Sequence, residues 1–177
     1  MRTTEPMLGQ MRLAWWREAL SKPVDQRPRG DMVLDGIGLH WRGGESALAA
    51  MVDGWEVLVT ADRLGKDEAQ AFGAGRGAFF PALAEPTPDT GARRLAAAGC
   101  RWALADAAAG VSDPDERRVL IAAGLAWEQG TGTVPKAVRG LAVLDALAIR
   151  ALRRGGRPLM EGRGASLTAL GAAIFRK

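Results

Sequence analysis

Apolar residues recur three and four positions apart along most of this sequence, and no stretch alternates apolar and polar residues as a strand would. The chain has no tyrosine and is rich in alanine and leucine, a composition that favours helices over strands. Its 177 residues are enough for one domain with a sizeable core and few for two. We therefore expect an all-α protein that forms a single domain over residues 1–177.

Stretches rich in proline and glycine divide the chain into helical segments. One of these segments has a clear start, because Asp113 can cap it, Pro114 suits its first position and Glu116 completes a capping box. The sequence contains no internal repeat. We expect helices close to residues 5–20, 46–64, 67–85, 91–110, 114–127, 136–154 and 165–175.

The opening stretch EPMLGQMRLAWWREAL carries two adjacent tryptophans in an otherwise apolar helix. At about 100° per residue it presents two apolar faces, one with Leu8, Met11, Trp15 and Ala19 and the other with Leu13, Trp16 and Leu20. Two faces predict packing on both flanks, with Arg12 buried between them. A buried guanidinium needs acceptors, so Arg12 either forms a structural ion pair or faces an anionic ligand from the helix wall.

Three glycines, Gly73, Gly75 and Gly77, fall in one predicted helix. A dinucleotide-binding loop would need a strand before it and an acidic residue about twenty positions later, whereas the flanks here are helical. We therefore expect these glycines to permit the close approach of neighbouring helices.

Cysteine and histidine each occur once, as Cys100 and His40. No disulfide can form within the chain, and a zinc site built from several Cys and His ligands is excluded. We expect His40 in a loop or at a helix start and not in a catalytic role. No apolar run approaches the ~20 residues of a membrane span and no signal peptide begins the chain, so we expect a cytoplasmic protein, with a position peripheral to the inner membrane as an alternative.

Asp31 and Asp35 form a D-x-x-x-D pair, a spacing that on a helix places both carboxylates on one face. Such a pair can share a hard cation. The pair follows Pro28 and Gly30 and has no second acidic cluster opposite it. A favourable effect of acidic charge at a helix start is therefore the preferred interpretation, and Asp31 and Asp35 are weak metal candidates.

Positive charge is concentrated at the C-terminal end, where residues 131–177 hold nine Lys and Arg against Asp145 and Glu161. In the predicted helix over 136–154, Lys136, Arg139, Arg150, Arg153 and Arg154 share one side. This stripe is either a solvated face or a site of weak attachment to an anionic membrane. The basic residues lack interleaved aromatics and no recognised nucleic-acid motif is present, so no nucleic acid is expected as a partner.

The opening stretch resembles the segment E-P-x-x-G-x-x-R-x-x-W-W-x-x-A-L found in bacterial members of the squalene/phytoene synthase family. Later segments are similar to that family in the same order: AAMVDGWEVLVTADRL, FGAGRGAFFPALA, AAGCRWALADAA and VPKAVRGLAVLDALAIRAL. The likeness covers nearly the whole chain, and the opening segment is its specific part.

The resemblance implies the isoprenoid-synthase fold, an antiparallel helical bundle around a central cavity. Active members hold prenyl diphosphates there through Mg²⁺ bound by two aspartate-rich motifs on opposing helices, because cations must absorb the charge of the leaving diphosphate. On this basis, and on their residue types, the candidate ligand-binding residues are Arg12, Trp15, Trp16, Arg76 and Asp106.

The sequence departs from the family at both metal motifs. The first motif lies on a helix before the tryptophan segment, and this sequence begins after that point, so we expect a bundle that is incomplete at its N-terminus. The second would fall in or after GCRWALADAAAGV, where Asp106 remains among alanines. The family's arginine–tyrosine–leucine–proline element is also missing. We therefore predict no cofactor, and Mg²⁺ belongs to the enzyme alternative alone.

Three functions stay open from the sequence. The first is a squalene/phytoene synthase-like protein without prenyl transfer that binds a prenyl diphosphate or lipid, or assists an assembly partner as the family's non-catalytic respiratory complex I assembly factors do. The second is a farnesyl or geranylgeranyl transferase whose N-terminal catalytic helix is missing from this chain. The third is a basic, anion-binding helical protein. A missing bundle helix would expose an apolar groove and favour a homodimer.

Overall fold

The computed structural model describes residues 6–41, 43–84, 89–127 and 132–175, and this part of the chain contains helices and no strand. The all-α prediction is confirmed. The helices are α1 (Pro6–Ser21), α2 (Met32–His40), α3 (Glu45–Thr60), α4 (Lys66–Gly77), α5 (Phe79–Ala82), α6 (Asp89–Gly110), α7 (Pro114–Ala126), α8 (Arg139–Arg153) and α9 (Gly164–Phe175), with short 3₁₀ turns at Val24–Gln26 and Lys136–Val138.

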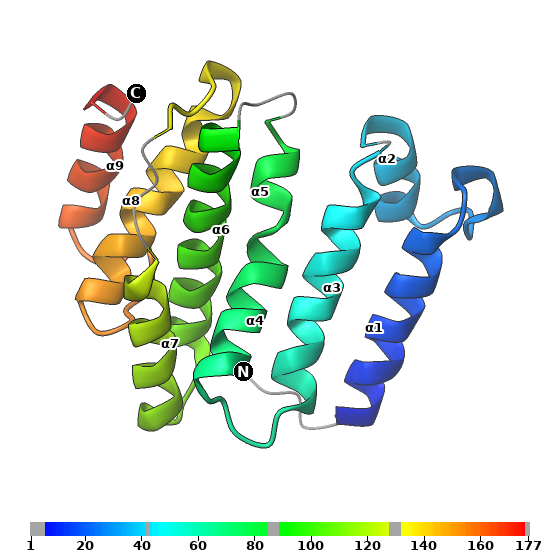
Figure 1. Cartoon of the computed structure of the whole chain (residues 1–177), viewed down its shortest axis with the longest axis horizontal. Coiled ribbons are helices and arrows are strands. Elements are labelled where there is room, and N and C mark those ends of the chain that lie inside the picture. The colour runs from blue at the N-terminus through cyan, green and yellow to red at the C-terminus, as the bar shows by residue number, and fades with distance from the viewer. Residues whose placement is uncertain (1–5, 42, 85–88, 128–131, 176–177) are drawn as a thin grey trace.

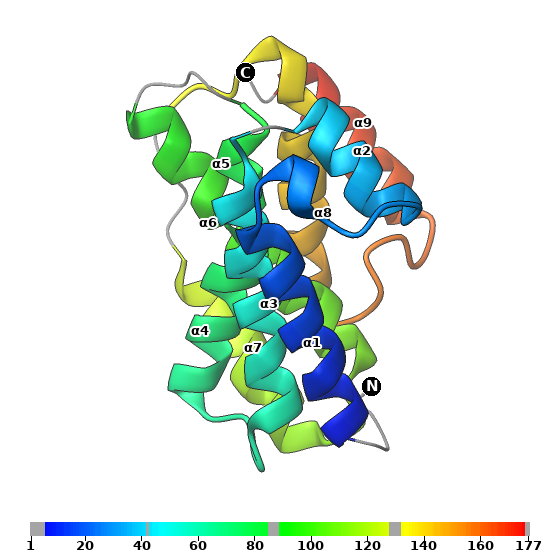
Figure 2. The same ribbon diagram turned by 90° about the vertical axis from the view of Figure 1, so that its right-hand side faces the viewer.

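The longer helices follow one another in a row that runs from α1 at one edge to α9 at the other (Figure 1). Along this row α1 packs against α3, α3 against α4, α4 against α6, α6 against α8 and α8 against α9, while α7 lies against α6. Figure 2 shows α1 beside α3, with α2 near the upper end of both. The row therefore has two edges, and each edge is a single helix.

The centre of the row is α6, whose alanines let neighbouring helices come close. Leu95, Ala103, Leu104 and Ala108 of this helix are fully buried, and α4, α5, α7 and α8 surround it. No helix in the described residues is long and apolar enough to cross a membrane.

The predicted role of the glycines in α4 is confirmed by their surroundings. A Cβ built on Gly75 would lie 2.8 Å from the Cα of Gly54 in α3. A Cβ built on Gly77 would collide with the carbonyl carbon of Gly99 in α6. Carbon atoms that are not bonded cannot approach so closely, so α4 meets both neighbours backbone to backbone and any larger residue would push the helices apart.

The prediction that α1 packs on both flanks is wrong. Its Leu13, Trp16 and Leu20 face packs against α2 and α3, but Met11 and Trp15 on the other face are exposed. Arg12 is exposed as well, contrary to the prediction that it is buried and paired. The reason is the position of α1, which lies at the edge of the row and has a helical neighbour on one side (Figure 1).

Two helix starts show how acidic residues act locally. Asp113 caps α7 by accepting hydrogen bonds from the backbone N–H groups of Asp115 and Glu116 at 2.7 and 3.4 Å. Asp31 caps α2 in the same way. The helix α2 was not predicted from the sequence, and His40 lies at its end and not at a helix start. The cap at Asp31 agrees with the preferred helix-start interpretation of this residue.

The basic stripe predicted over 136–154 is not continuous. Arg139, Arg153 and Arg154 are exposed, but they lie at opposite ends of α8. Between them the helix is buried on most sides, because α6 and α9 pack against it. The cations of α8 therefore form two separate groups.

Arg101 of α6 is the most deeply buried arginine among the described residues, and it was not predicted from the sequence. Its Nε donates to Oδ1 of Asp145 in α8 at 2.6 Å, and its Nη1 donates to the carbonyl of Trp127 at 3.0 Å. The side chains of Arg101 and Asp145 are 2% and 9% exposed. This pair joins α6, α8 and the end of α7 inside the core.

Replacing Arg101 with Met should destabilise the fold by about 3–5 kcal/mol, because Asp145 loses its buried cationic partner. The matched control is Arg118→Met, which removes an exposed arginine paired with Asp115 and should cost about 0–1 kcal/mol. Urea denaturation followed by circular dichroism measures both. Equal effects of the two substitutions would contradict the structural role given to Arg101.

Replacing Gly77 with Ala should destabilise the fold by about 1–3 kcal/mol, since the new methyl group meets the backbone of Gly99. Gly36→Ala in α2 is the control, because nothing lies within 4 Å of a Cβ at that position. The control should leave stability unchanged or raise it by about 0.5–1 kcal/mol, as alanine favours helices over glycine. Thermal unfolding of both variants tests the contact, and a neutral Gly77→Ala would disprove it.

Candidate ligand-binding groove

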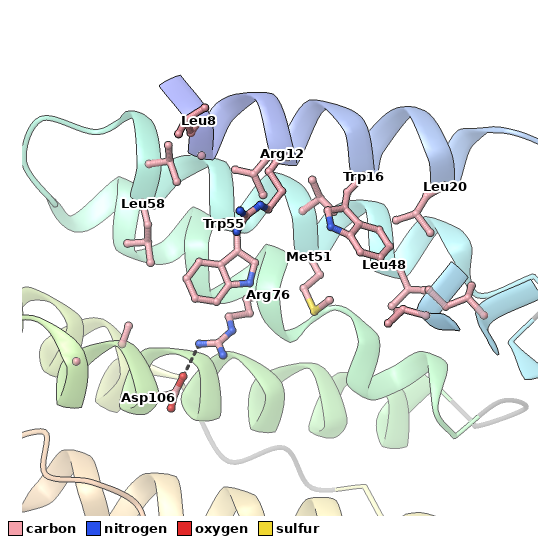
Figure 3. Close-up of a pocket in the computed structure, with 18 of the residues that line it drawn as sticks. Leu8, Arg12, Trp16, Leu20, Leu48, Met51, Trp55, Leu58, Arg76 and Asp106 are labelled. Atoms are coloured by element: carbon pink, nitrogen blue, oxygen red, sulfur yellow. Dashed lines mark hydrogen bonds and ion pairs between the residues drawn. The ribbon is translucent and has the colours of Figure 1, made fainter. Parts of the chain in front are cut away.

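A groove of about 1060 Å³ runs between α1 and α3, with α2 at one end and α6 beneath it (Figure 3). Its lining is mostly apolar, and Arg12, Arg76 and Asp106 are the charged residues among the described residues that form it. The lining residues are Leu8, Gly9, Arg12, Leu13, Trp16, Leu20, Val33, Ile37, Trp41, Leu48, Met51, Val52, Trp55, Leu58, Val59, Leu64, Arg76, Asp106, Ala107, Gly110 and Val111.

The groove is open to solvent because α1 forms an edge of the row. Leu8 and Val33, on its rim, are more than half exposed, whereas Leu48 and Val52 in its wall are buried. A long apolar molecule could therefore enter from the side and lie along α3. An apolar groove of this size with a few polar groups is typical of ligand sites, which commonly measure about 300–1,000 Å³.

Arg76 is the most constrained charged residue of the groove. The centre of its guanidinium lies 4.5 Å from the ring centroid of Trp55 in α3 and 4.6 Å from that of Trp102 in α6. These distances are those of cation–π contacts on two sides. Gly75 and Gly77, on either side of Arg76, hold α4 against α3 and α6, and this packing places the arginine between the two tryptophans.

Asp106 completes this cluster from α6. Its Oδ2 accepts a hydrogen bond from Nη1 of Arg76 at 2.7 Å (Figure 3). The side chain of Arg76 is 12% exposed, while that of Asp106 is 47% exposed. The carboxylate can therefore leave the arginine for solvent at small cost, whereas the arginine is fixed by the two rings.

Arg12 faces the same groove from α1, and Figure 3 shows it reaching in above Trp55. Among the described residues no hydrogen bond or ion pair connects it to an acid, so its charge can meet an anion in the groove. Trp16 lines the groove beside it. Trp15 stacks edge-on against Trp16, with ring centroids 5.1 Å apart, but does not line the groove.

The end of the groove near α2 is fixed by a buried arginine, Arg27. Its Nε donates to the carbonyl of Lys22 at 2.9 Å, and its Nη2 donates to Oε1 of Glu45 at 3.1 Å. Burial raises the pKa of Glu45, but its backbone hydrogen bonds and the contact with Arg27 outweigh burial and lower it overall. The pair thus ties the end of α1 to the start of α3 and keeps the two walls together.

The weak metal candidates Asp31 and Asp35 lie outside the groove lining. Asp31 accepts from the backbone N–H groups of Val33 and Leu34 at 2.9 and 3.0 Å, and Asp35 accepts from that of Gly30 at 3.2 Å. The carboxylates therefore hold the start of α2. No group of three or more His, Cys, Asp or Glu side chains suited to a metal occurs among the described residues.

Cys100 does not have the low pKa of a reactive thiol. Burial raises its pKa to about 11, although the charge of Arg101 lowers it. A thiol of that pKa is protonated at neutral pH and is a poor nucleophile. The groove itself combines an apolar surface with Arg12 and with Arg76, whose guanidinium is hydrogen-bonded to the carboxylate of Asp106.

Four of the five candidate ligand-binding residues, Arg12, Trp16, Arg76 and Asp106, thus line one groove, and Trp15 lies beside it. Trp55 and Trp102, which hold Arg76 and come from separate helices, were not predicted to belong to the site. Comparison of this chain with models of protein families, with curated proteins and with solved structures finds no match.

Replacing Arg76 with Met should destabilise the fold by about 1–2 kcal/mol, because both cation–π contacts are lost. Arg76→Lys keeps the charge but not the flat guanidinium, so it should recover only part of this loss. Denaturant unfolding of the two variants tests the prediction. A Met variant as stable as the original protein would show that the contacts with Trp55 and Trp102 contribute nothing.

Proposed function

We propose that this protein binds a long-chain amphiphile with an anionic head, with a prenyl diphosphate as the best candidate, and holds it without converting it. The observation that carries the proposal is the combination of an open apolar groove with Arg12 at its mouth and Arg76 at its base. The apolar chain would lie along α3, and the head would lie at the part of the groove where Arg12 and Arg76 flank Trp55.

The apolar part of the groove suits a chain and not a compact polar molecule. Leu48, Met51, Val52 and Leu58 form a continuous wall on α3, with Trp16 opposite them on α1. Burial of apolar surface contributes about 25 cal/mol per Å², so a long chain gains most of its affinity here. A nucleotide or a sugar would leave its polar groups without partners against this wall.

The head group would meet two different cations. Arg12 is exposed and can turn toward a phosphate, whereas Arg76 is fixed between two rings and already contacts Asp106. An arriving anion competes with Asp106 for Arg76, and the exposure of the carboxylate makes its displacement easy. Arginine is suited to this role because its planar fork matches phosphate oxygens.

The assignment to a squalene/phytoene synthase-like protein of the isoprenoid-synthase type is part of this proposal. Its support is the resemblance of the opening segment together with the all-helical groove, whose wall that segment supplies. Metal-dependent prenyl transfer needs several carboxylates that converge on Mg²⁺. Asp106 is the one acid among the described residues that line the groove, and its carboxylate is hydrogen-bonded to Arg76. For this reason we propose binding without transfer.

Titration with farnesyl or geranylgeranyl diphosphate, followed by calorimetry or by tryptophan fluorescence, tests binding. Arg12→Gln should weaken it about tenfold, the equivalent of one charge-assisted contact, whereas Arg29→Gln on a loop outside the groove should not. Met51→Gln should weaken binding because it places a polar group against the apolar chain of the ligand. The control Met32→Gln, at an exposed position of α2, should leave binding unchanged. Palmitate and an anionic phospholipid, titrated in parallel, distinguish a diphosphate head from any anionic head.

Turnover is tested separately by incubating the protein with either diphosphate and Mg²⁺, with and without NADPH. We expect no squalene, phytoene or cyclopropyl intermediate above a control without protein. Formation of such a product would refute binding without transfer and support the transferase alternative. Loss of that product on joint replacement of Asp31 and Asp35 would then identify them as the metal site.

A further inference from the structure

The last helix, α9, has a surface that its position in the fold does not explain. Its twelve residues, GASLTALGAAIF, include no charged side chain. Ala165 and Ala172 are buried against α8, but Leu167 is 73% exposed, and Leu170, Ile174 and Phe175 are exposed as well. A helix that is apolar all round is ordinarily buried on every side.

The position of α9 leaves this surface open. It forms the edge of the row opposite α1, and its packing partner is α8 (Figures 1 and 2). The helix therefore presents a stripe of large apolar residues, Leu167, Leu170 and Ile174, at helical spacing on the outside of the protein. Contiguous exposed apolar surface of this kind marks a site of interaction.

Exposed cations surround the stripe. Arg153, Arg154, Arg157 and Arg163 are exposed and lie from the end of α8 to the residue before α9. Since α8 and α9 run in opposite directions, the start of α8 lies near the end of α9 (Figure 1). Arg139, the first residue of α8, and Lys136, in the 3₁₀ turn before it, are exposed. Glu161 is the one acid in residues 150–175, and it contacts Arg157 at 3.5 Å.

We propose that α9 docks on an anionic lipid surface, lying in the interface with its apolar stripe inserted and the surrounding arginines against the lipid head groups. The positive charge around the stripe indicates which partner it contacts. Two copies of this edge facing each other would bring like charges together, whereas phosphates of anionic lipids neutralise them. At twelve residues α9 is also too short to cross a bilayer, which takes about 20, so it lies flat.

Docking at this edge is independent of the groove, because α9 and α1 lie at opposite edges of the row (Figure 1). It also differs from attachment through the α8 stripe predicted from the sequence. The apolar contribution comes from α9, and the basic residues of α8 act from its two ends.

Co-sedimentation with vesicles tests the proposal. The protein should bind vesicles that contain phosphatidylglycerol and bind pure phosphatidylcholine vesicles much more weakly, and salt should weaken the binding. Leu170→Gln with Ile174→Gln should abolish it. The matched control, Met32→Gln with Leu39→Gln, changes two exposed apolar residues of α2 and should leave it intact. All four positions are exposed, so the fold should be retained, as circular dichroism can check.

A second pair of variants tests the charge. Arg154→Gln with Arg163→Gln should weaken binding about 25-fold, since each basic residue near an anionic surface contributes about fivefold. Arg63→Gln with Arg118→Gln removes the same charge from a distant exposed site and should have no such effect. Equal binding to neutral and anionic vesicles, or no binding to either, would overturn the proposal. The proposal would also be overturned if light scattering without lipid detected a dimer and the α9 substitutions dissociated it.

Discussion

The contact on which the rest of this structure depends is the backbone approach of α4 to its two neighbours. Gly75 meets Gly54 of α3, and Gly77 meets Gly99 of α6, at distances that leave no room for a Cβ. These two contacts fix three helices against one another without any long side chain between them. Arg76 lies between the two glycines in sequence, and so it is placed where Trp55 and Trp102 from the flanking helices can hold its guanidinium. The charged base of the groove is thus a consequence of how the core packs.

The sequence predicted the helices well because their signals are local. Periodicity, proline breaks and the cap at Asp113 depend on neighbouring residues, and the structure keeps them. The glycines of α4 were also predictable, since helical flanks exclude a nucleotide loop and leave close packing. The candidate residues Arg12, Trp16, Arg76 and Asp106 line one groove, although the sequence alone could not show that three helices bring them together.

Apart from α2, which was not predicted, the failures concern position within the fold. Two apolar faces on α1 predict neighbours on both sides, but the helix lies at an edge, and Arg12 is therefore exposed. Likewise, nothing in the sequence distinguishes Arg101 from the other arginines. Its buried contact with Asp145 depends on the packing of α6 against α8, and the two residues are 44 positions apart in the sequence. Edge and centre are properties of the assembled helices, so periodicity cannot distinguish them.

Both edges of the row expose apolar surface, and the two proposed sites differ in character. At α1 the surface is concave and contains cations inside it, which favours an amphiphile in the groove. At α9 it is a convex stripe with cations around it, which favours a lipid surface.

Amide hydrogen exchange with and without geranylgeranyl diphosphate tests the central claim, ligand binding in the groove, most directly. Because α1 has helical neighbours on one side, its amides should exchange faster than those of α6 and slow markedly with the ligand, together with those of α3, while α9 is unaffected. Unchanged exchange in α1 and α3 at saturating ligand, or protection confined to α9, would contradict the account.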